Sequence, residues 1–444
     1  MNLLKKISLH ILFLFFFFHS ICQSSLSTPY SSKQISDSSL LDLVQKQTIN
    51  YFWEFAHPVS GMARERSNHS FETSSKVVTT GGTGFGIMAL IVAAERKWLP
   101  RDSVANRILK TIKFLSAADS YHGVFPHWMN GSTGATIKFS RKDDGADLVE
   151  TSYLLQGLLC ARQYFDRHER TESEIRNRIN FLWNDVEWNW FTKNGEEVLY
   201  WHWSPNNGWS MNFPLRGYNE CLITYVLAAS AVNFPVSEKV YHRGWAQSNF
   251  FNNGKTFYNY KLPLGFDFGG PLFYTHYSFL GLDPRGLKDR YANYWEQNLN
   301  HTLINRAYCI DNPKKFVGYG ENEWGLTSSD NQEGYNGHSP TNDLGVISPT
   351  AALSAFPYTP EYSMKALKNF YYNMGNKIWG KYGFVDAFNK TENWYANSYL
   401  AIDQGPEVVM IENYRSGLFW KLFMSCPEVQ AGLKKLDFTS PMIK

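Results

Sequence analysis

Apolar residues recur three and four positions apart along most of this chain, which is the spacing of one face of a helix. The pattern predicts a series of long helices joined by connections that are rich in Gly, Asn and Pro. The expected helices cover residues 38–56, 84–97, 102–116, 145–166, 172–184, 216–232, 287–303, 361–378 and 404–422.

The stretch 145–166 is apolar on nearly all sides, which is typical of a helix in an inner layer. No fixed-period repeat indicates a solenoid, and no linker or change of composition divides the chain. Successive helical hairpins, apolar inside and amphipathic outside, would close into one all-α (α/α)6 toroid over residues 38–444, with short β segments in its loops. The expected strands are short and cover 123–128, 136–141, 197–203 and 382–388.

The first 22 residues have the pattern of a secretory signal peptide. Lys5 and Lys6 precede a short apolar run, and cleavage is expected after Cys22. The run is too short to span a bilayer, so the chain is expected to be periplasmic or secreted, with lipid anchoring at Cys22 as the alternative. Residues 23–37 are polar and rich in Ser, and we expect them to be a mobile segment. No later segment is predicted to cross a membrane.

Four cysteines remain after Cys22: Cys160, Cys221, Cys309 and Cys426. Their spacings match no zinc-binding pattern. An exported protein can form disulfides, but a chain of this size does not need one to be stable. Free buried thiols are therefore expected, and the disulfide alternative stays open.

The 444 residues include 43 Lys and Arg against 40 Asp and Glu, which gives a net charge of only +3. This balance provides no basic surface for nucleic acid or anionic membrane. Aromatic residues reach 16%, including 15 Trp. Because their rings combine a flat apolar face with a polar edge, an excess of Trp and Tyr indicates a wet binding cleft.

Carboxylates collect at the expected start of the helix 145–166. Asp147 and Glu150 are three residues apart and share one helix face, and Asp143 comes just before them. Capping of the helix N-terminus explains such acids equally well. Glu150, however, leads directly into an apolar helix, and a buried carboxyl has a raised pKa that suits a proton donor.

A second acid, Glu220, opens another apolar helix and follows three tryptophans, of which Trp209 is the nearest. An ion pair with Arg216, four residues earlier, is the alternative role for Glu220. Asp403 stands before Pro406, which suits the first turn of a helix, so that Asp403 is either a helix cap or a site residue.

Further candidates lie in loops that are rich in aromatic residues. His276 follows the segment Phe266–Pro271 and is interpreted either as a core histidine or as a site residue. The other candidates for sugar binding are Trp209, Arg216, Tyr319, Trp324 and Trp394.

Several classes of enzyme are excluded by missing motifs. The chain has no dinucleotide-binding or Walker glycine pattern, no G-x-S-x-G and no H-E-x-x-H. The glycine run at 81–84 has no expected strand before it, so it does not indicate a phosphate site. Carboxylates and tryptophans on an exported helical protein favour a carbohydrate-processing cleft.

Six segments, in order, closely resemble the glycoamylase-like domain, and most of all the bacterial endo-β-1,2-glucanases of glycoside hydrolase family 144. The resemblance extends from about residue 38 to the C-terminus, and the acids Asp143, Asp147, Glu150, Glu220 and Asp403 all match. The segments are DGADLVETSYLLQGLL, RGYNECLITYVLA, FDFGGPLFYTHYSFLGLDPRG, NEWGLTSSD, YGFVDAFN and YLAIDQGPEVVMIENYRSGLFW.

The resemblance implies an (α/α)6 toroid and an exported hydrolase that cleaves β-1,2-glucan with inversion to sophorose or short oligosaccharides. A monomer without metal or organic cofactor is expected, since two carboxyls and water suffice. Our assignment is Glu150 as acid and an ionised Asp403 as base, with Trp209, Trp324 and Trp394 stacking on glucose. The alternatives are another glycosidase specificity, such as an α-glucan exo-hydrolase, and a non-catalytic glycan-binding protein.

Overall fold

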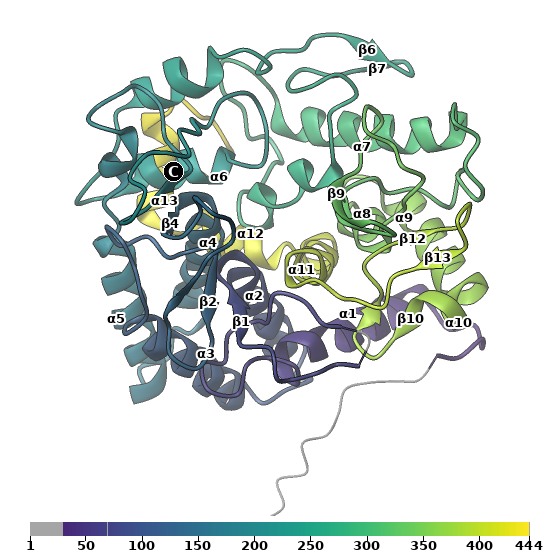
Figure 1. Cartoon of the computed structure of the whole chain (residues 1–444), viewed down its shortest axis with the longest axis horizontal. Helices are drawn as coiled ribbons and strands as arrows, with labels where there is room; N and C mark the ends of the chain where they lie inside the picture. The colour runs from purple at the N-terminus through teal and green to yellow at the C-terminus, as the bar shows by residue number, and fades with distance from the viewer. Residues whose placement is uncertain (1–29, 69, 444) are drawn as a thin grey trace, which may run out of the picture.

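The computed structural model describes residues 30–68 and 70–443 and is rich in helices (Figure 1). The expected signal peptide lies outside the described residues. The α-helices are α1 (Asp37–Trp53), α2 (Thr80–Glu95), α3 (Arg101–Leu115), α4 (Leu148–Tyr164), α5 (Arg170–Asp185), α6 (Leu222–Ser230), α7 (Tyr294–Asp311), α8 (Pro349–Ser354), α9 (Pro360–Lys368), α10 (Gly375–Ile378), α11 (Ala401–Ser416), α12 (Leu418–Met424) and α13 (Pro427–Lys435).

Strands are short and form small antiparallel units between the helices. The largest is a three-stranded sheet in the order β1-β2-β3, and the others are two-stranded. The strands are β1 (Val77–Thr79), β2 (Trp128–Asn130), β3 (Thr136–Ile137), β4 (Ala146–Asp147), β5 (His202–Trp203), β6 (Thr256–Phe257), β7 (Tyr260–Lys261), β8 (Ser328–Asn331), β9 (Gly334–Gly337), β10 (Trp379–Gly380), β11 (Gly383–Phe384), β12 (Phe388–Asn389) and β13 (Trp394–Tyr395).

The helices form an inner and an outer layer, as their apolar patterns predict. The inner helices α2 and α4 are buried almost throughout, and α2 also packs against α11. The outer helices α3 and α5 pack against each other and bury only one face. Gly84 and Gly157 allow the backbones of α2 and α4 to touch, because a Cβ atom on either residue would lie 2.2 Å from a carbonyl oxygen of the other helix.

Both boundaries of the expected helix 404–422 differ from the sequence prediction. The expected helix 404–422 ends at Gly417, whose φ of +66° is a left-handed conformation that terminates helices, and α12 follows. The same helix begins earlier than predicted, at Ala401, so Pro406 lies inside α11. Asp403 is therefore in the first turn of α11 and is not its cap, which is Leu400.

The start of the described chain packs against the C-terminal half. The Tyr30 hydroxyl donates to the carbonyl of Tyr372 at 3.2 Å, and the Ile35 N–H donates to the Tyr372 hydroxyl at 3.0 Å. Ser36 caps α1. Thus the described part of the segment that we expected to be mobile, residues 30–36, makes specific contacts.

Two further expectations can be examined within the described range. Cys160, Cys221, Cys309 and Cys426 are all buried and free, as predicted. Within residues 30–68 and 70–443, every helix is too short or too polar to cross a membrane.

Candidate active site

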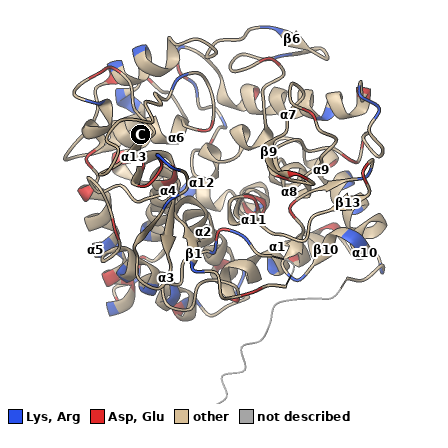
Figure 2. Ribbon diagram, viewed as in Figure 1, with Lys and Arg blue, Asp and Glu red and all other residues tan. Residues whose placement is uncertain are grey.

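A cavity of about 400 Å³ opens where the starts of several helices meet. It lies near the first turns of α2, α4 and α11, and β8 and β9 form part of its wall. Acidic residues occur along this central region as well as on the outer helices (Figure 2). The lining residues are Glu65, Arg66, Thr79, His127, Trp128, Phe139, Glu150, Tyr153, Trp201, Glu220, Phe273, Tyr277, Ser328, Tyr335, Leu400 and Ile402.

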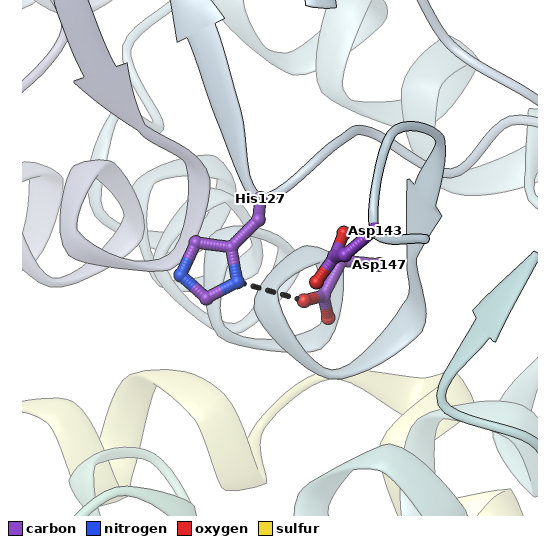
Figure 3. Close-up of side chains that lie close together, drawn as sticks. All are labelled: His127, Asp143 and Asp147. Atoms are coloured by element: carbon purple, nitrogen blue, oxygen red, sulfur yellow. Dashed lines mark hydrogen bonds and ion pairs between the residues drawn. The ribbon is translucent and has the colours of Figure 1, made fainter. Parts of the chain in front are cut away.

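Asp147 is both a helix cap and a partner of His127. One carboxylate oxygen accepts hydrogen bonds from the N–H groups of Val149 at 3.1 Å and Glu150 at 2.9 Å, at the start of α4. The other oxygen lies 2.9 Å from His127 Nδ1 (Figure 3). Asp147 is completely buried. The capping role considered from the sequence is therefore correct for Asp147, and the cap also orients an imidazole that lines the cavity.

His127 comes from the segment that enters β2. Burial alone would lower the pKa of His127, but the charge of Glu150 and the hydrogen bond to Asp147 outweigh it and raise the pKa to about 9. At neutral pH the ring is therefore an imidazolium. The positive charge of His127 thus acts on the nearby acids Glu150 and Asp147.

Asp143 belongs to the same corner of the molecule but does not line the cavity. Its Oδ1 atom lies 2.8 Å from Nε2 of His202, in β5. Pairing of β4 with β5 brings His202 close to this acidic segment, since Asp147 is opposite His202 in the register. Asp143 is thus paired with His202 beside the site.

Glu150 projects from the first turn of α4 into the cavity. Burial raises the pKa of Glu150 to about 7, even though the charge of His127 opposes the shift. The backbone N–H of Gly81, in α2, donates to Glu150 Oε2 at 2.8 Å. The charge of His127 and the hydrogen bond from Gly81 both stabilise the carboxylate form of Glu150. The prediction of a raised pKa at Glu150 is confirmed, and the glycine run at 81–84 holds a carboxylate close to its backbone.

Glu220 lines the same cavity from the segment that precedes α6. Burial raises the pKa of Glu220 to about 7, and the charge of Glu150 adds to the shift. Its Oε2 atom is buried and has no hydrogen-bond partner among the described residues. The ion pair with Arg216 does not form, since no salt bridge within the described ranges includes Glu220 and the Arg216 side chain is exposed.

Asp403 lies behind the cavity wall. The hydroxyl of Tyr277, which lines the cavity, donates to Asp403 Oδ1 at 3.5 Å. Burial and the neighbouring carboxyl of Asp386 raise the pKa of Asp403 well above its usual range. This raised pKa opposes the ionised state that we expected for Asp403 as a base, because its site is enclosed and not a solvated cap.

The carboxyls of Asp386 and Asp403 interact with each other, and burial raises the pKa of both. The N–H of Asp330 donates to Asp386 at 2.7 Å. The Asp330 carboxylate in turn accepts from Arg66 Nη1 at 2.9 Å. This chain of contacts links Arg66 on the cavity wall to the acids behind it.

Aromatic rings form much of the cavity wall. Trp128 follows His127 at the start of β2, and its ring packs edge-on against Phe139 at 4.8 Å between centroids. Trp201 lies opposite the start of α4, where its carbonyl accepts from the Leu148 N–H at 2.9 Å. These rings provide flat apolar surfaces next to Glu150.

The sugar-binding candidates predicted from the sequence lie elsewhere. Trp324 is completely buried and is a core residue, and His276 is buried with a pKa lowered by burial to about 3, as for a core histidine. The Tyr319 hydroxyl donates to Asp343 at 2.8 Å. All six candidates are within the described chain, and none lines the cavity: Trp209, Arg216, His276, Tyr319, Trp324 and Trp394.

One group of side chains could hold a metal ion. One ligand atom from each of His127, Asp143 and Asp147 lies within 4.8 Å of the others. Metal binding would require His127 to lose the proton that its raised pKa favours. Hydrolysis without a metal stays our prediction.

The sequence analysis missed several residues of the site. Arg66 and Asp330 are 264 positions apart, and no spacing pattern joins them. His127 was included only as part of an expected strand, and Asp386 was not chosen as a candidate although it lies in the matched segment YGFVDAFN. A signal was available for Tyr277, since it follows the recognised segment Phe266–Pro271.

Several proteins that are similar to this chain are named as carbohydrate-active enzymes. The glycoamylase family model ("Putative glucoamylase") matches residues 212–427. A curated relative, the exo β-1,2-glucooligosaccharide sophorohydrolase (non-reducing end) of Parabacteroides distasonis, is 45% identical over 424 residues, which are 91% of this chain and 58% of that protein. The chain thus spans somewhat more than half the length of that relative.

Two solved structures extend the comparison. The endo-β-1,2-glucanase of Chitinophaga pinensis, in complex with sophorotriose and glucose, is 56% identical, covers 92% of this chain and 100% of its own, and superposes with a TM-score of 0.90. A variant endo-β-1,2-glucanase of Talaromyces funiculosus with β-1,2-glucan is 11% identical, covers 91% of this chain and 92% of its own, and has a TM-score of 0.61. The fungal likeness concerns the fold alone.

Proposed function

This chain belongs to the glycoamylase-like family, and on that premise we propose that it is a glycoside hydrolase acting on β-1,2-glucan. The bacterial relatives at 45% and 56% identity are named for this substrate. The observation that carries the proposal is the pair Glu150 and Glu220, two carboxyls of raised pKa on the wall of one cavity. Glycoside hydrolysis commonly uses two carboxyls, one as the acid and one as the base.

Glu220 is the proton donor in this proposal. Burial keeps it neutral up to a pH of about 7, and its Oε2 atom has no described partner inside the protein. A neutral carboxyl with one unpartnered oxygen can donate its proton to the glycosidic oxygen while the bond from that oxygen to the anomeric carbon breaks. This assignment replaces our sequence-based choice of Glu150 as the acid.

Glu150 is the base. The Gly81 N–H and the His127 imidazolium both favour its carboxylate, whereas Glu220 has neither contact. As a carboxylate it takes a proton from a water molecule, whose oxygen attacks the anomeric carbon on the face opposite the leaving group. The sugar released from a β linkage then has the α configuration, which is inversion.

The proposal also includes the fold, the oligomeric state, the location and the products. Buried α2 and α4 inside amphipathic α3 and α5 support an (α/α)6 toroid. We place the catalytic domain at residues 38–444 and expect a monomer that is exported to the periplasm or beyond. The products are sophorose or short β-1,2-glucooligosaccharides.

Two alternatives from the sequence analysis remain as outcomes of the test. Another glycosidase specificity would use the same carboxyls with a different glucan. A non-catalytic glycan-binding protein would bind without turnover, but it gains nothing from two buried acids of raised pKa.

The deciding experiment is incubation of the protein with linear β-1,2-glucan, starch, cellulose and laminarin, followed by chromatography of the products. We expect turnover of β-1,2-glucan and little of the others. Turnover of starch without turnover of β-1,2-glucan would overturn the substrate, and binding without any products would overturn the activity. Early NMR spectra of the products test inversion, which a β product would contradict.

A further inference from the structure

A second cavity, of about 480 Å³, lies beside the loops that lead into and out of the β6–β7 hairpin (Figure 1). Phe250 and Phe266 stand at its wall with their rings stacked, 5.3 Å apart between centroids and 26° between planes. The exposed fractions of these residues are 64% and 40%. The pair therefore offers a flat apolar surface to solvent.

Phe250 is fixed in this exposed position. Its φ of +64° is left-handed, which bulky residues rarely adopt. Its carbonyl accepts from the Tyr218 N–H at 3.3 Å, and its neighbour Phe251 is completely buried against Trp245. Backbone strain and exposure of an aromatic ring both cost stability, and a fold that bears both at one residue indicates a binding role for it.

One shared segment joins the second cavity to the active site. Gly270 and Pro271 line the second cavity, and Phe273, two residues later, lines the active-site cavity. Phe250, which also lines the second cavity, lies close to Gly217, in the segment that leads to Glu220.

The β8–β9 hairpin provides another connection. Ser328 and Tyr335 line the active-site cavity, whereas Ser339 and Thr341, just after β9, line the second cavity. Gly337 lies close to both Ser328 and Pro271. The two cavities are therefore bordered by the same segments, 270–273 and the β8–β9 hairpin.

Polar groups edge the aromatic pair. Lys255 Nζ lies 2.9 Å from Asp267 Oδ1, and Asn253 donates to the same carboxylate oxygen at 3.2 Å. These side chains are exposed enough to exchange partners with a ligand. A glucose ring has the matching form, with C–H bonds on its faces and hydroxyls around its edge.

We infer that the cavity beside Phe250 and Phe266 is a distal subsite, which binds glucose units of a β-1,2-glucan chain that extends beyond the active site. The inference rests on the proposed function. Only a substrate long enough to cover both cavities reaches the aromatic pair, so the subsite favours long chains over short oligosaccharides.

The test compares Phe250→Ala and Phe266→Ala with a matched control, Phe181→Ala. Phe181 is also 64% exposed but is in α5, on the outer layer. For each variant, kcat/KM is measured on long linear β-1,2-glucan and on the shortest β-1,2-glucooligosaccharide that the wild type cleaves. We expect Phe250→Ala and Phe266→Ala to lose about fivefold to tenfold on the polymer with no change on the oligosaccharide, and Phe181→Ala to change neither.

Equal losses on both substrates, or no loss on the polymer, would overturn the subsite while the wild-type activity upholds the proposed function. A wild type that is inactive on every β-1,2-glucan would instead overturn the proposed function. The cavity could instead bind a second copy of the chain, which light scattering tests. A dimer that Phe250→Ala dissociates would overturn the subsite, whereas a monomer in every variant supports it.

Discussion

Glu220 and Glu407 are two buried glutamates with raised pKa values in different surroundings. Burial raises the pKa of Glu220 to about 7 and that of Glu407 to about 8. Glu220 lines the active-site cavity, whereas Glu407, in α11, is completely buried, accepts a hydrogen bond from the Thr48 hydroxyl at 3.5 Å and does not line the cavity. The comparison teaches that a raised pKa alone does not identify a catalytic acid. Access of the carboxyl to a cavity is also required.

Asp386 and Asp403 extend the same comparison to a pair of acids. Their carboxyls interact behind Tyr277, and neither lines the cavity. The charge of Glu150 also raises the pKa of Glu220, but both of these acids face the cavity. Two acid pairs thus lie in one region of the protein, and only one can touch a substrate.

The largest expected effect is a difference in kcat between the variants Glu220→Gln and Glu407→Gln. Glu220→Gln should lower kcat on β-1,2-glucan by about 10²–10⁴-fold, because the amide keeps the shape and cannot donate the proton. Glu407→Gln should leave kcat within about threefold of the wild type, since Glu407 has no route to the substrate. Circular dichroism shows whether each variant is folded. Equal losses in two folded variants would break the comparison.

The next effect concerns stability against pH. The folded state raises the pKa of Glu407 from 4.5 to about 8, so between these values the folded protein binds more protons than the unfolded chain. The contribution of Glu407 is complete below pH 4.5 and falls as pH rises to about 8, by a few kcal/mol. Glu407→Gln removes this titration. Urea unfolding at several pH values should show a shallower loss for Glu407→Gln than for the wild type, and identical slopes would contradict the raised pKa.

A smaller loss is expected from the enclosed acid pair. Asp403→Asn and Asp386→Asn should each reduce kcat by about tenfold, through displacement of Tyr277 and the cavity wall and not through loss of a reacting proton. Steady-state kinetics on β-1,2-glucan measure this loss. If Asp403→Asn were as inactive as Glu220→Gln while folded, Asp403 would have a direct role after all.

The smallest effect distinguishes two half-buried tryptophans. Trp201 lines the cavity, whereas the ring of Trp209 packs against Trp190 and Tyr200. Trp201→Ala should raise KM by about fivefold. Trp209→Ala should leave KM unchanged and lower the free energy of unfolding by about 2 kcal/mol. The reverse pattern would restore our sequence-based prediction for Trp209.

Local patterns explain how much could be predicted from the sequence. Helices such as α1, α3 and α5 follow from apolar spacing, and Asp147 and Glu150 follow from an acidic start to an apolar helix. The start of α2 at Thr80 was missed because its glycines resemble a loop. They form a helix only because α4 packs closely enough to require them.

Contacts between distant segments could not be predicted in this way. Asp386 is adjacent to Asp403 and Asp330 only in the folded chain. Trp324 has polar neighbours in the sequence, which indicated a cleft, yet folding buries it completely. Loop residues show no period from which burial can be inferred, so aromatic residues in loops were the least reliable candidates.

The most direct test of the central claim uses an aryl β-sophoroside, whose leaving group departs without protonation. If Glu220 is the proton donor and Glu150 the base, Glu220→Gln should retain kcat on this substrate within about tenfold of the wild type, although it is nearly inactive on β-1,2-glucan. Glu150→Gln should be inactive on both. Retained activity of Glu150→Gln with loss of Glu220→Gln on the aryl substrate would contradict the account, because it would reverse the two roles.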